Sequence, residues 1–188
     1  MAVSIAAVVT VVLVQRRSLR PLLGLRLRWV WLIWLAALVQ FVRTRDPHWA
    51  GAAVPMVAMW LLGVAFVVAN LRAMPPRARI GAGILAAGFS LNSLVIVFNG
   101  AMPFSTASAR LAGFSTGAIQ APAYGHAPIG ADTALAALAD VIPVPGLGVV
   151  VSIGDLLMVT GVAWLLSQLA LGPRHLDMAS PQPTRRGT

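Results

Sequence analysis

The chain is organised around residues Ala139 to Asp155, which read A-D-V-I-P-V-P-G-L-G-V-V-V-S-I-G-D. It holds two of the chain's five acidic residues, Asp140 and Asp155, and leads directly into the last long apolar run. Because the connector between these residues is rich in proline and glycine, it can fold back and bring the two carboxylates together. An earlier apolar run ends at residues 99–103, N-G-A-M-P. We expect both segments to meet at one face of a membrane.

The composition indicates a protein that crosses a lipid bilayer several times. The 188 residues are 59% hydrophobic and 10% charged, whereas a soluble domain is about 45–50% apolar and about 25% charged. The net charge of +9 comes from arginine, and the arginines lie at the ends of apolar runs. We therefore expect the lipid bilayer as a partner and no nucleic acid. Because the chain has no cysteine and only three scattered histidines, we expect no metal site and no cofactor.

Five apolar segments predict an all-α, polytopic fold with five transmembrane helices. The first is short for a span of about 30 Å, so a helix lying at the membrane interface is the alternative. Its arginines follow the apolar core, which is the reverse of a secretory signal. We expect one transmembrane domain over residues 1–172, with a long outer loop over 100–148 between helices four and five, and a polar tail over 173–188. The segments are residues 1–14, 27–42, 51–70, 80–98 and 149–171.

The distribution of arginine predicts the orientation in the membrane. Five arginines lie in the first loop, three in the second and three in the tail, whereas Arg43, Arg45 and Arg110 lie on the other side. The positive-inside rule then predicts a multi-pass protein with its N-terminus and long loop outside and its C-terminus in the cytoplasm. Within that loop, residues 131–140 predict a short helix with Asp132 as its N-cap.

Small and polar residues recur along the fourth apolar segment. Gly81, Gly88, Asn92 and Asn99 lie seven, four and seven residues apart, which puts them on one stripe of a helix. Such a stripe in a membrane helix usually marks its contact with another helix. We therefore expect this face to be an interface.

Two motifs near the outer face have both a structural and a functional interpretation. Asn99-Gly100 followed by Pro103 is typical of a helix end. Ser152-x-x-Asp155 is typical of a capping box, in which Asp155 would have a structural role only. The alternative is that these residues line a polar site that binds a substrate. The candidate residues for that site are Asn92, Asn99, Gly100, Met102, Pro103 and Ser152.

Asp140 is harder to explain as a structural residue. It lies between apolar stretches that should hold it at the membrane surface, where an acidic residue is costly and a functional candidate. If Asp155 lies close to it in a dry site, the two carboxylates cannot both ionise, and the pair could act as acid and base on a water. The histidines offer no partner at a useful spacing, and His126, in G-H-A-P, is interpreted as part of a surface turn.

These motifs resemble those of a family of small bacterial polytopic membrane proteins of unknown function. In that family a segment ending L-N-x-x-V-I-x-x-N-G-x-M-P is followed by a loop, by x-D-I-I-P and by S-I-G-D. The resemblance implies a bacterial plasma membrane and brings no activity with it. The matching residues are Leu91-Asn92, Val95-Ile96, Asn99-Gly100, Met102-Pro103, 140–143 and 152–155.

A shorter resemblance is to lipoprotein signal peptidase. In that family a V-D-x-I-D segment and an N-x-A-D segment opening the last helix supply two catalytic aspartates, and the resemblance implies that Asp140 and Asp155 would be that pair. The chain departs from the pattern because Ser152 stands where the family has asparagine, three residues before Asp155. The family's G-N-x-x-D-R motif is also absent.

Two functions therefore stay open. The first is a non-catalytic membrane protein, a subunit or a small-ligand or partner-binding protein with a polar site at its outer face, which could assemble with other membrane-protein subunits. The second is an aspartyl peptidase or hydrolase at the outer leaflet. There Asp140 and Asp155 would position a water, while Asn92 and Asn99 orient the carbonyl of a lipid-anchored substrate. We favour the first, because each motif has a sufficient structural explanation.

Overall fold

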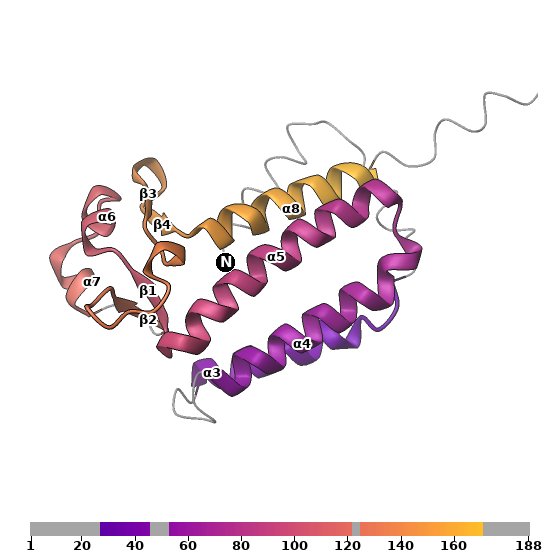
Figure 1. Ribbon diagram of the computed structural model, residues 1–188, viewed down its shortest axis with the longest axis horizontal. Coiled ribbons are helices and arrows are strands. Elements are labelled where there is room, and N and C mark those ends of the chain that lie inside the picture. Colours follow the sequence, from indigo (N-terminus) through magenta and orange to yellow (C-terminus); the bar gives the residue numbers. More distant parts are fainter. Residues whose placement is uncertain (1–26, 46–52, 122–124, 171–188) are drawn as a thin grey trace, which may run out of the picture.

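The computed structural model describes residues 27–45, 53–121 and 125–170. This part of the chain is mostly helical and has two regions along its long axis, which Figure 1 shows: long helices lying side by side, and a smaller unit of short helices and strands at one end. We call residues 100–121 and 125–152 the end unit.

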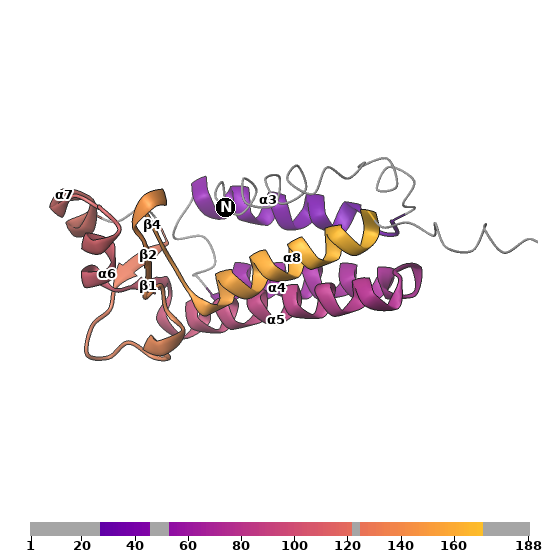
Figure 2. The same cartoon turned by 90° about the horizontal axis from the view of Figure 1, so that it is seen from above.

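The long helices run side by side in both views of the molecule (Figures 1 and 2). The backbone N–H of Arg28 donates to Oδ1 of the buried Asn70 at 2.8 Å, and Nδ2 of Asn70 donates back to the Arg28 carbonyl at 2.9 Å. These bonds tie the start of the first helix to the end of the second, so the two run in opposite directions. The helices are α3 (Trp31–Arg45), α4 (Ala53–Asn70), α5 (Pro76–Asn99) and α8 (Ile153–Ala170), and the 3₁₀ helix η1 (Leu71–Ala73) follows α4.

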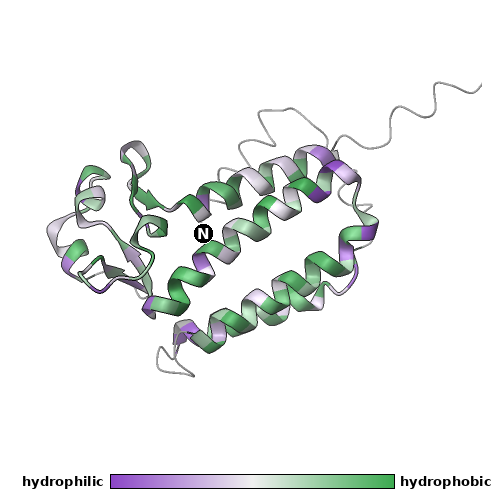
Figure 3. Ribbon diagram, in the orientation of Figure 1, coloured by the Kyte–Doolittle hydropathy of each residue, from purple (hydrophilic) through white to green (hydrophobic). Residues whose placement is uncertain are grey.

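In the part of the chain that the structure describes, two helical stretches are long and apolar enough to cross a membrane. They are Ala53–Ala73 and Pro76–Asn99, with 21 and 24 residues, and at about 1.5 Å per residue each exceeds about 30 Å. Shorter apolar stretches lie in α3 and α8. Figure 3 shows the hydrophobic residues along the helices. The first apolar segment and the polar tail lie outside the described residues, so five spans remain a prediction.

The ends of α5 follow from proline and glycine. The helix begins at Pro76, earlier than the predicted residue 80, because proline is well suited to the first helical turn. It ends at Asn99 and is capped by Gly100, which has a φ of 75° and donates its N–H to the Ile96 carbonyl at 2.8 Å. The helix end predicted from Asn99-Gly100 is therefore confirmed, because glycine adopts this left-handed conformation without a steric penalty.

Short strands in the end unit correct the expectation of a purely all-α fold. The backbone groups of this segment need hydrogen-bond partners, and part of it finds them in two small sheets: β1 (Met102–Phe104) pairs in parallel with β2 (His126–Pro128), and β3 (Ile142–Val144) pairs antiparallel with β4 (Val149–Val151). As β4 occupies residues 149–151, α8 begins at Ile153 and not at the predicted residue 149. The other elements are α6 (Thr106–Leu111), α7 (Thr116–Gln120), η2 (Ala136–Leu138) and η3 (Pro145–Leu147).

The predicted helix over residues 131–140 is wrong. Only the single turn η2 forms there, Asp132 lies in a turn, and Leu135 has a φ of 56°, outside the helical region. The reason is tertiary: the side chain of Asn99 accepts the N–H of Ala134 and donates to its carbonyl, each at 2.9 Å. These bonds use backbone groups that a continuous helix would need for itself.

The stripe of small residues on α5 forms the contact with α8. A Cβ added at Gly88 would lie 2.5 Å from the Gly154 carbonyl oxygen, and one added at Gly81 would lie 2.7 Å from the Leu165 nitrogen and 2.9 Å from the Gly161 oxygen. The two backbones therefore approach more closely than any side chain would allow, and the predicted interface is confirmed. We call these glycines of α5 and α8 the glycine seam.

Candidate functional site

The β3–β4 hairpin brings Asp140 and Asp155 to the same end of the helix bundle. Asp140 lies two residues before β3, and Ser152 follows β4 directly. The register pairs Ile142 with Val151, so the proline- and glycine-rich connector folds back as predicted. The hairpin therefore returns the chain from Asp140 to the first turn of α8.

The backbone of Asp140 also joins the segment that follows α5. Its N–H donates to the Pro103 carbonyl at 3.0 Å, and its own carbonyl accepts from the Ser105 N–H at 2.9 Å. Residues 99–103 and 140–155 thus meet, as the sequence led us to expect. Met102 and Pro103 are buried in β1, opposite His126 and Ala127.

Asp155 belongs to the capping box of α8. Its Oδ2 accepts the backbone N–H of Ser152 at 3.0 Å, and its own N–H donates to Oγ of Ser152 at 2.9 Å. The arrangement is the reciprocal one expected from Ser-x-x-Asp. It satisfies two backbone donors at the start of a helix, where no intrahelical partner exists.

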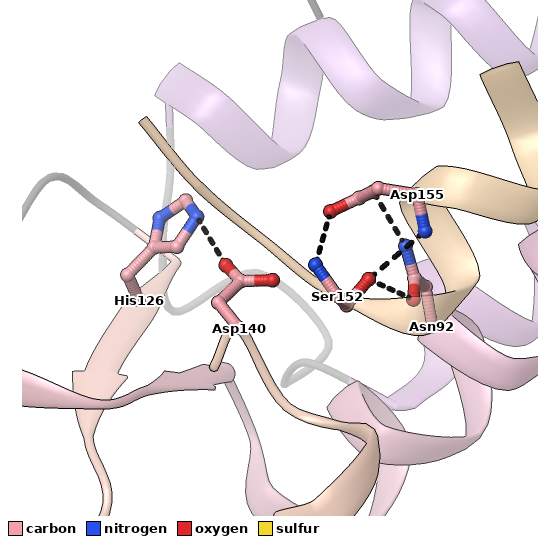
Figure 4. Close-up of polar contacts among 5 residues, drawn as sticks. All are labelled: Asn92, His126, Asp140, Ser152 and Asp155. Carbon is pink, nitrogen blue, oxygen red and sulfur yellow. Dashed lines mark hydrogen bonds and ion pairs between the residues drawn. The ribbon is translucent and has the colours of Figure 1, made fainter. Parts of the chain in front are cut away.

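Asn92 extends this cap into a network between two helices (Figure 4). Its Nδ2 donates to Oδ1 of Asp155 at 2.8 Å, and its Oδ1 accepts from the hydroxyl of Ser152 at 2.9 Å. Both carboxylate oxygens of Asp155 therefore have a donor. Asn92 lies seven residues before the end of α5. At about 1.5 Å per residue, the first turn of α8 therefore contacts α5 about 10 Å along the helix axis from its C-terminal end.

An apolar pocket of about 250 Å³ lies in the end unit. Among the described residues that line this pocket, Asp140 and His126 are polar and the others are apolar. Its apolar wall includes Phe104, Ala109 and Ile119, which form the small hydrophobic core of the unit with Val150. The lining residues are Phe104, Ala109, Phe114, Ala118, Ile119, His126, Asp140, Val149 and Val150.

The carboxyl group of Asp140 is nearly buried and accepts no hydrogen bond from the part of the chain that the structure describes. Its side chain is 10% exposed, and Oδ2 lies 3.9 Å from Nε2 of His126, which is beyond hydrogen-bonding distance. Within the described residues, no hydrogen bond reaches this carboxylate. Burial, and then the negative charge of Asp155, raise the pKa of Asp140 from 3.8 to about 7.

The two aspartates therefore occupy different environments. Asp155 accepts two hydrogen bonds in a helix cap, whereas Asp140 faces an apolar pocket, and no hydrogen bond joins their carboxylates within the described chain. The charge of Asp155 nevertheless acts on Asp140. In the described residues no cluster of three metal-ligating side chains exists.

His126 is the polar lining residue that the sequence analysis missed. It lies in β2, beside Met102 of β1, and 14 positions separate it from Asp140 in the numbering. A short tripeptide strand ending in proline gives no periodic pattern, so the sequence indicated a turn. The one usable indication was chemical: a histidine and an aspartate in the same loop of a chain with few charged residues.

Comparison with known proteins places the chain in a family. Residues 24–167 match the family of unknown function DUF5317, a stretch that includes α3, α4, α5, the end unit and most of α8. The chain belongs to DUF5317. This confirms the resemblance to an uncharacterised family, while the resemblance to lipoprotein signal peptidase stays a prediction. No curated protein and no solved structure matches the chain.

Proposed function

We propose that this DUF5317 protein is a multi-pass membrane protein that binds a small ligand in its end unit without transforming it. The observation that carries this proposal is the nearly buried Asp140 carboxyl group on the wall of an apolar pocket. Ligand pockets typically combine an apolar lining with a few polar groups that fix the ligand's orientation. A perturbed acid in such a pocket is a candidate binding group.

The remaining polar residues support binding over catalysis. Asp155, Ser152 and Asn92 satisfy one another's hydrogen bonds. Asn99 donates to the carbonyls of Val95 and Ala134 and accepts the N–H of Ala134. Each of these side chains therefore has a structural task, which leaves Asp140 and His126 to meet a ligand.

The proposed orientation puts the pocket outside a bacterial plasma membrane. Arg28, Arg72 and Arg77 lie where α3 begins, α4 ends and α5 begins, whereas Arg43 and Arg45 lie at the other end of α3. Under the positive-inside rule the arginine-rich end is cytoplasmic. The end unit would then face outward, with the N-terminus outside, the C-terminus in the cytoplasm, and residues 1–14 contributing the first of five spans.

The test measures saturable binding to the full chain in lipid nanodiscs by ¹⁹F NMR. The probes are 4-fluorobenzyl alcohol and 4-fluorobenzylamine, and empty nanodiscs report partition into lipid. The control variant is Ala118→Trp, because Ala118 is exposed and lines the pocket, so the indole would occupy it. We expect saturable binding of at least one probe and its loss in the variant. Saturable binding of neither probe, or equal binding by Ala118→Trp, would contradict the proposal.

A second candidate is an aspartyl hydrolase that uses Asp140 and Asp155 on a lipid-anchored peptide. The observation in its favour is that the charge of Asp155 helps to raise the pKa of Asp140 to about 7, as in carboxylate pairs that divide acid and base roles. Cleavage of a fluorogenic lipopeptide by the wild type, lost in Asp140→Asn and Asp155→Asn with folding intact, would establish it. Loss of expression in Asp155→Asn alone would indicate the helix cap instead.

A further inference from the structure

The pocket of the end unit has a feature that indicates the chemistry of its ligand. The Asp140 side chain is nine-tenths buried and lines the cavity, and its Oδ2 lies 3.9 Å from Nε2 of His126, beyond hydrogen-bonding distance. A carboxylate can accept about four hydrogen bonds, and burying one without donors is costly. Because residues 27–45, 53–121 and 125–170 supply no hydrogen-bond donor to this carboxylate, a ligand that carries donors would fit it.

The charge around this carboxylate is also unbalanced. Asp155 acts on Asp140 from the first turn of α8, and its own oxygens are held in place by Asn92 and by the Ser152 backbone. The rest of the described lining is apolar, apart from His126. A cation placed beside Asp140 would be attracted by two carboxylates, whereas an anion would be repelled by both.

The size of the cavity limits the apolar part of the ligand. A volume of about 250 Å³, set against about 30 Å³ for each water-sized group, holds about eight non-hydrogen atoms. Phe104 and Phe114 line the same space, and aromatic rings favour both apolar groups and cations at their faces.

We propose that the pocket selects a small amphipathic cation whose ammonium group donates hydrogen bonds to the Asp140 carboxylate while its apolar body packs against Phe104 and Phe114. This rests on the proposed ligand-binding function and names the chemical class of its ligand. Asp155 stays in the helix cap and acts through its charge alone. No bond is made or broken in the ligand.

The experiment compares three probes of one shape on the full chain in nanodiscs: 4-fluorobenzylamine, which is an ammonium ion at pH 7, 4-fluorobenzyl alcohol and 4-fluorobenzoate. Affinities are measured by ¹⁹F NMR for the wild type, Asp140→Asn, Asp132→Asn and Ala118→Trp. Asp132 is the matched control, because it is an exposed aspartate of the same unit. Empty nanodiscs again report partition into lipid.

In the wild type we expect the amine to bind at least about 10-fold more tightly than the alcohol, since a hydrogen bond to a charged group contributes about that much, and the benzoate to bind most weakly. Asp140→Asn should leave amine and alcohol with similar affinity, while Asp132→Asn keeps the preference. If Asp140→Asn does not fold, Ala118→Trp decides in its place: amine binding should be lost when the indole fills the pocket, and amine binding that persists would place the cation elsewhere.

Three outcomes would overturn this inference. Equal or tighter binding of the alcohol or the benzoate by the wild type would show a pocket without cation selectivity, and the proposed ligand-binding function would survive. An amine preference that persists in a folded Asp140→Asn variant would place the cation elsewhere. Absence of saturable binding by every probe would remove both the inference and the proposed function.

Discussion

At the scale of single residues, the carboxylates of Asp140 and Asp155 have different environments because different numbers of hydrogen-bond donors reach them. Asp155 accepts hydrogen bonds from Asn92 and from the Ser152 backbone, whereas Asp140 is nearly buried and accepts none from the described residues. Burial without donors favours the neutral acid at Asp140. One residue type thus serves a helix cap and a pocket wall in the same molecule.

The pocket wall predicts a pH dependence of stability. The pKa of Asp140 is about 7 in the folded protein, above its ordinary value of 3.8, so the folded state holds a proton that the unfolded state releases. This stabilisation is complete below about pH 4 and is lost as the pH rises through 7. We expect Tm, followed by tryptophan fluorescence, to fall by several degrees between pH 5 and pH 8, at about 2–4 °C per kcal/mol.

The groups that face Asp140 are His126 and Asp155, so the contribution of Asp140 is isolated by substitution. Asp140→Asn should flatten the dependence, and Asp132→Asn, at an exposed position, should leave it unchanged. A Tm of the wild type that rises over this pH range would contradict the assignment.

Removal of the helix cap should destabilise the bundle. Ser152→Ala deletes the acceptor for the Asp155 N–H and the donor to Asn92, and loss of such a cap costs about 1–2 kcal/mol. Ser115→Ala is the matched control, because Ser115 caps the short α7 with a single exposed bond of 3.3 Å. The Tm should drop clearly for the first and little for the second; equal effects would argue against the network.

At this scale the sequence predicted local chemistry better than distant pairing. The spacing of Ser152 and Asp155 and the Asn99-Gly100 pair were sufficient to predict a cap and a helix end, because both motifs are local. The approach of His126 to Asp140 depends on β1–β2 pairing and could not be read from nearby residues. The bond from Asn92 to Asp155 spans 63 positions, and only the shared stripe on α5 hinted at it.

At the scale of secondary-structure elements, the glycine seam fixes α8 against α5. Gly88→Ala would put a methyl group 2.5 Å from the Gly154 oxygen, and such overpacking typically costs about 1–3 kcal/mol. Gly83→Ala is the control on the same helix, because a Cβ there meets nothing within 4 Å. We expect a lower Tm for the first variant and an unchanged or slightly higher Tm for the second; a neutral Gly88→Ala would contradict the seam.

The long apolar helices were predictable, and so was the meeting of residues 99–103 with 140–155, but the short elements of the end unit were not. Hydrophobic runs determine α4 and α5 to within a few residues, because their length is imposed by local composition. The three-residue strands and the turn over residues 131–140 are set by tertiary hydrogen bonds such as those from Asn99 to Ala134. Hydrogen bonds between residues far apart in the sequence leave no periodic pattern, so they could not be predicted from it.

At the scale of the whole molecule, the proposed topology predicts which surface is accessible from outside the cell. The chain has no cysteine, so single cysteines can be placed at exposed positions: Ser115→Cys in the end unit and Ala73→Cys at the opposite end. A membrane-impermeant maleimide should label the first on intact cells and the second only after the membrane is disrupted. Labelling of Ala73→Cys alone on intact cells would reverse the orientation.

The chain enters and leaves the end unit through α5 and α8, and this has a mechanical consequence. Those two helices are locked at the glycine seam and by the Asn92 network, and α5 packs more extensively against α8 than against α4. The end unit, which contains the pocket, is therefore connected to the bundle through a pair of tightly packed helices. We therefore expect a displacement of the end unit to move α5 and α8 together, because α5 is held more closely to α8 than to α4.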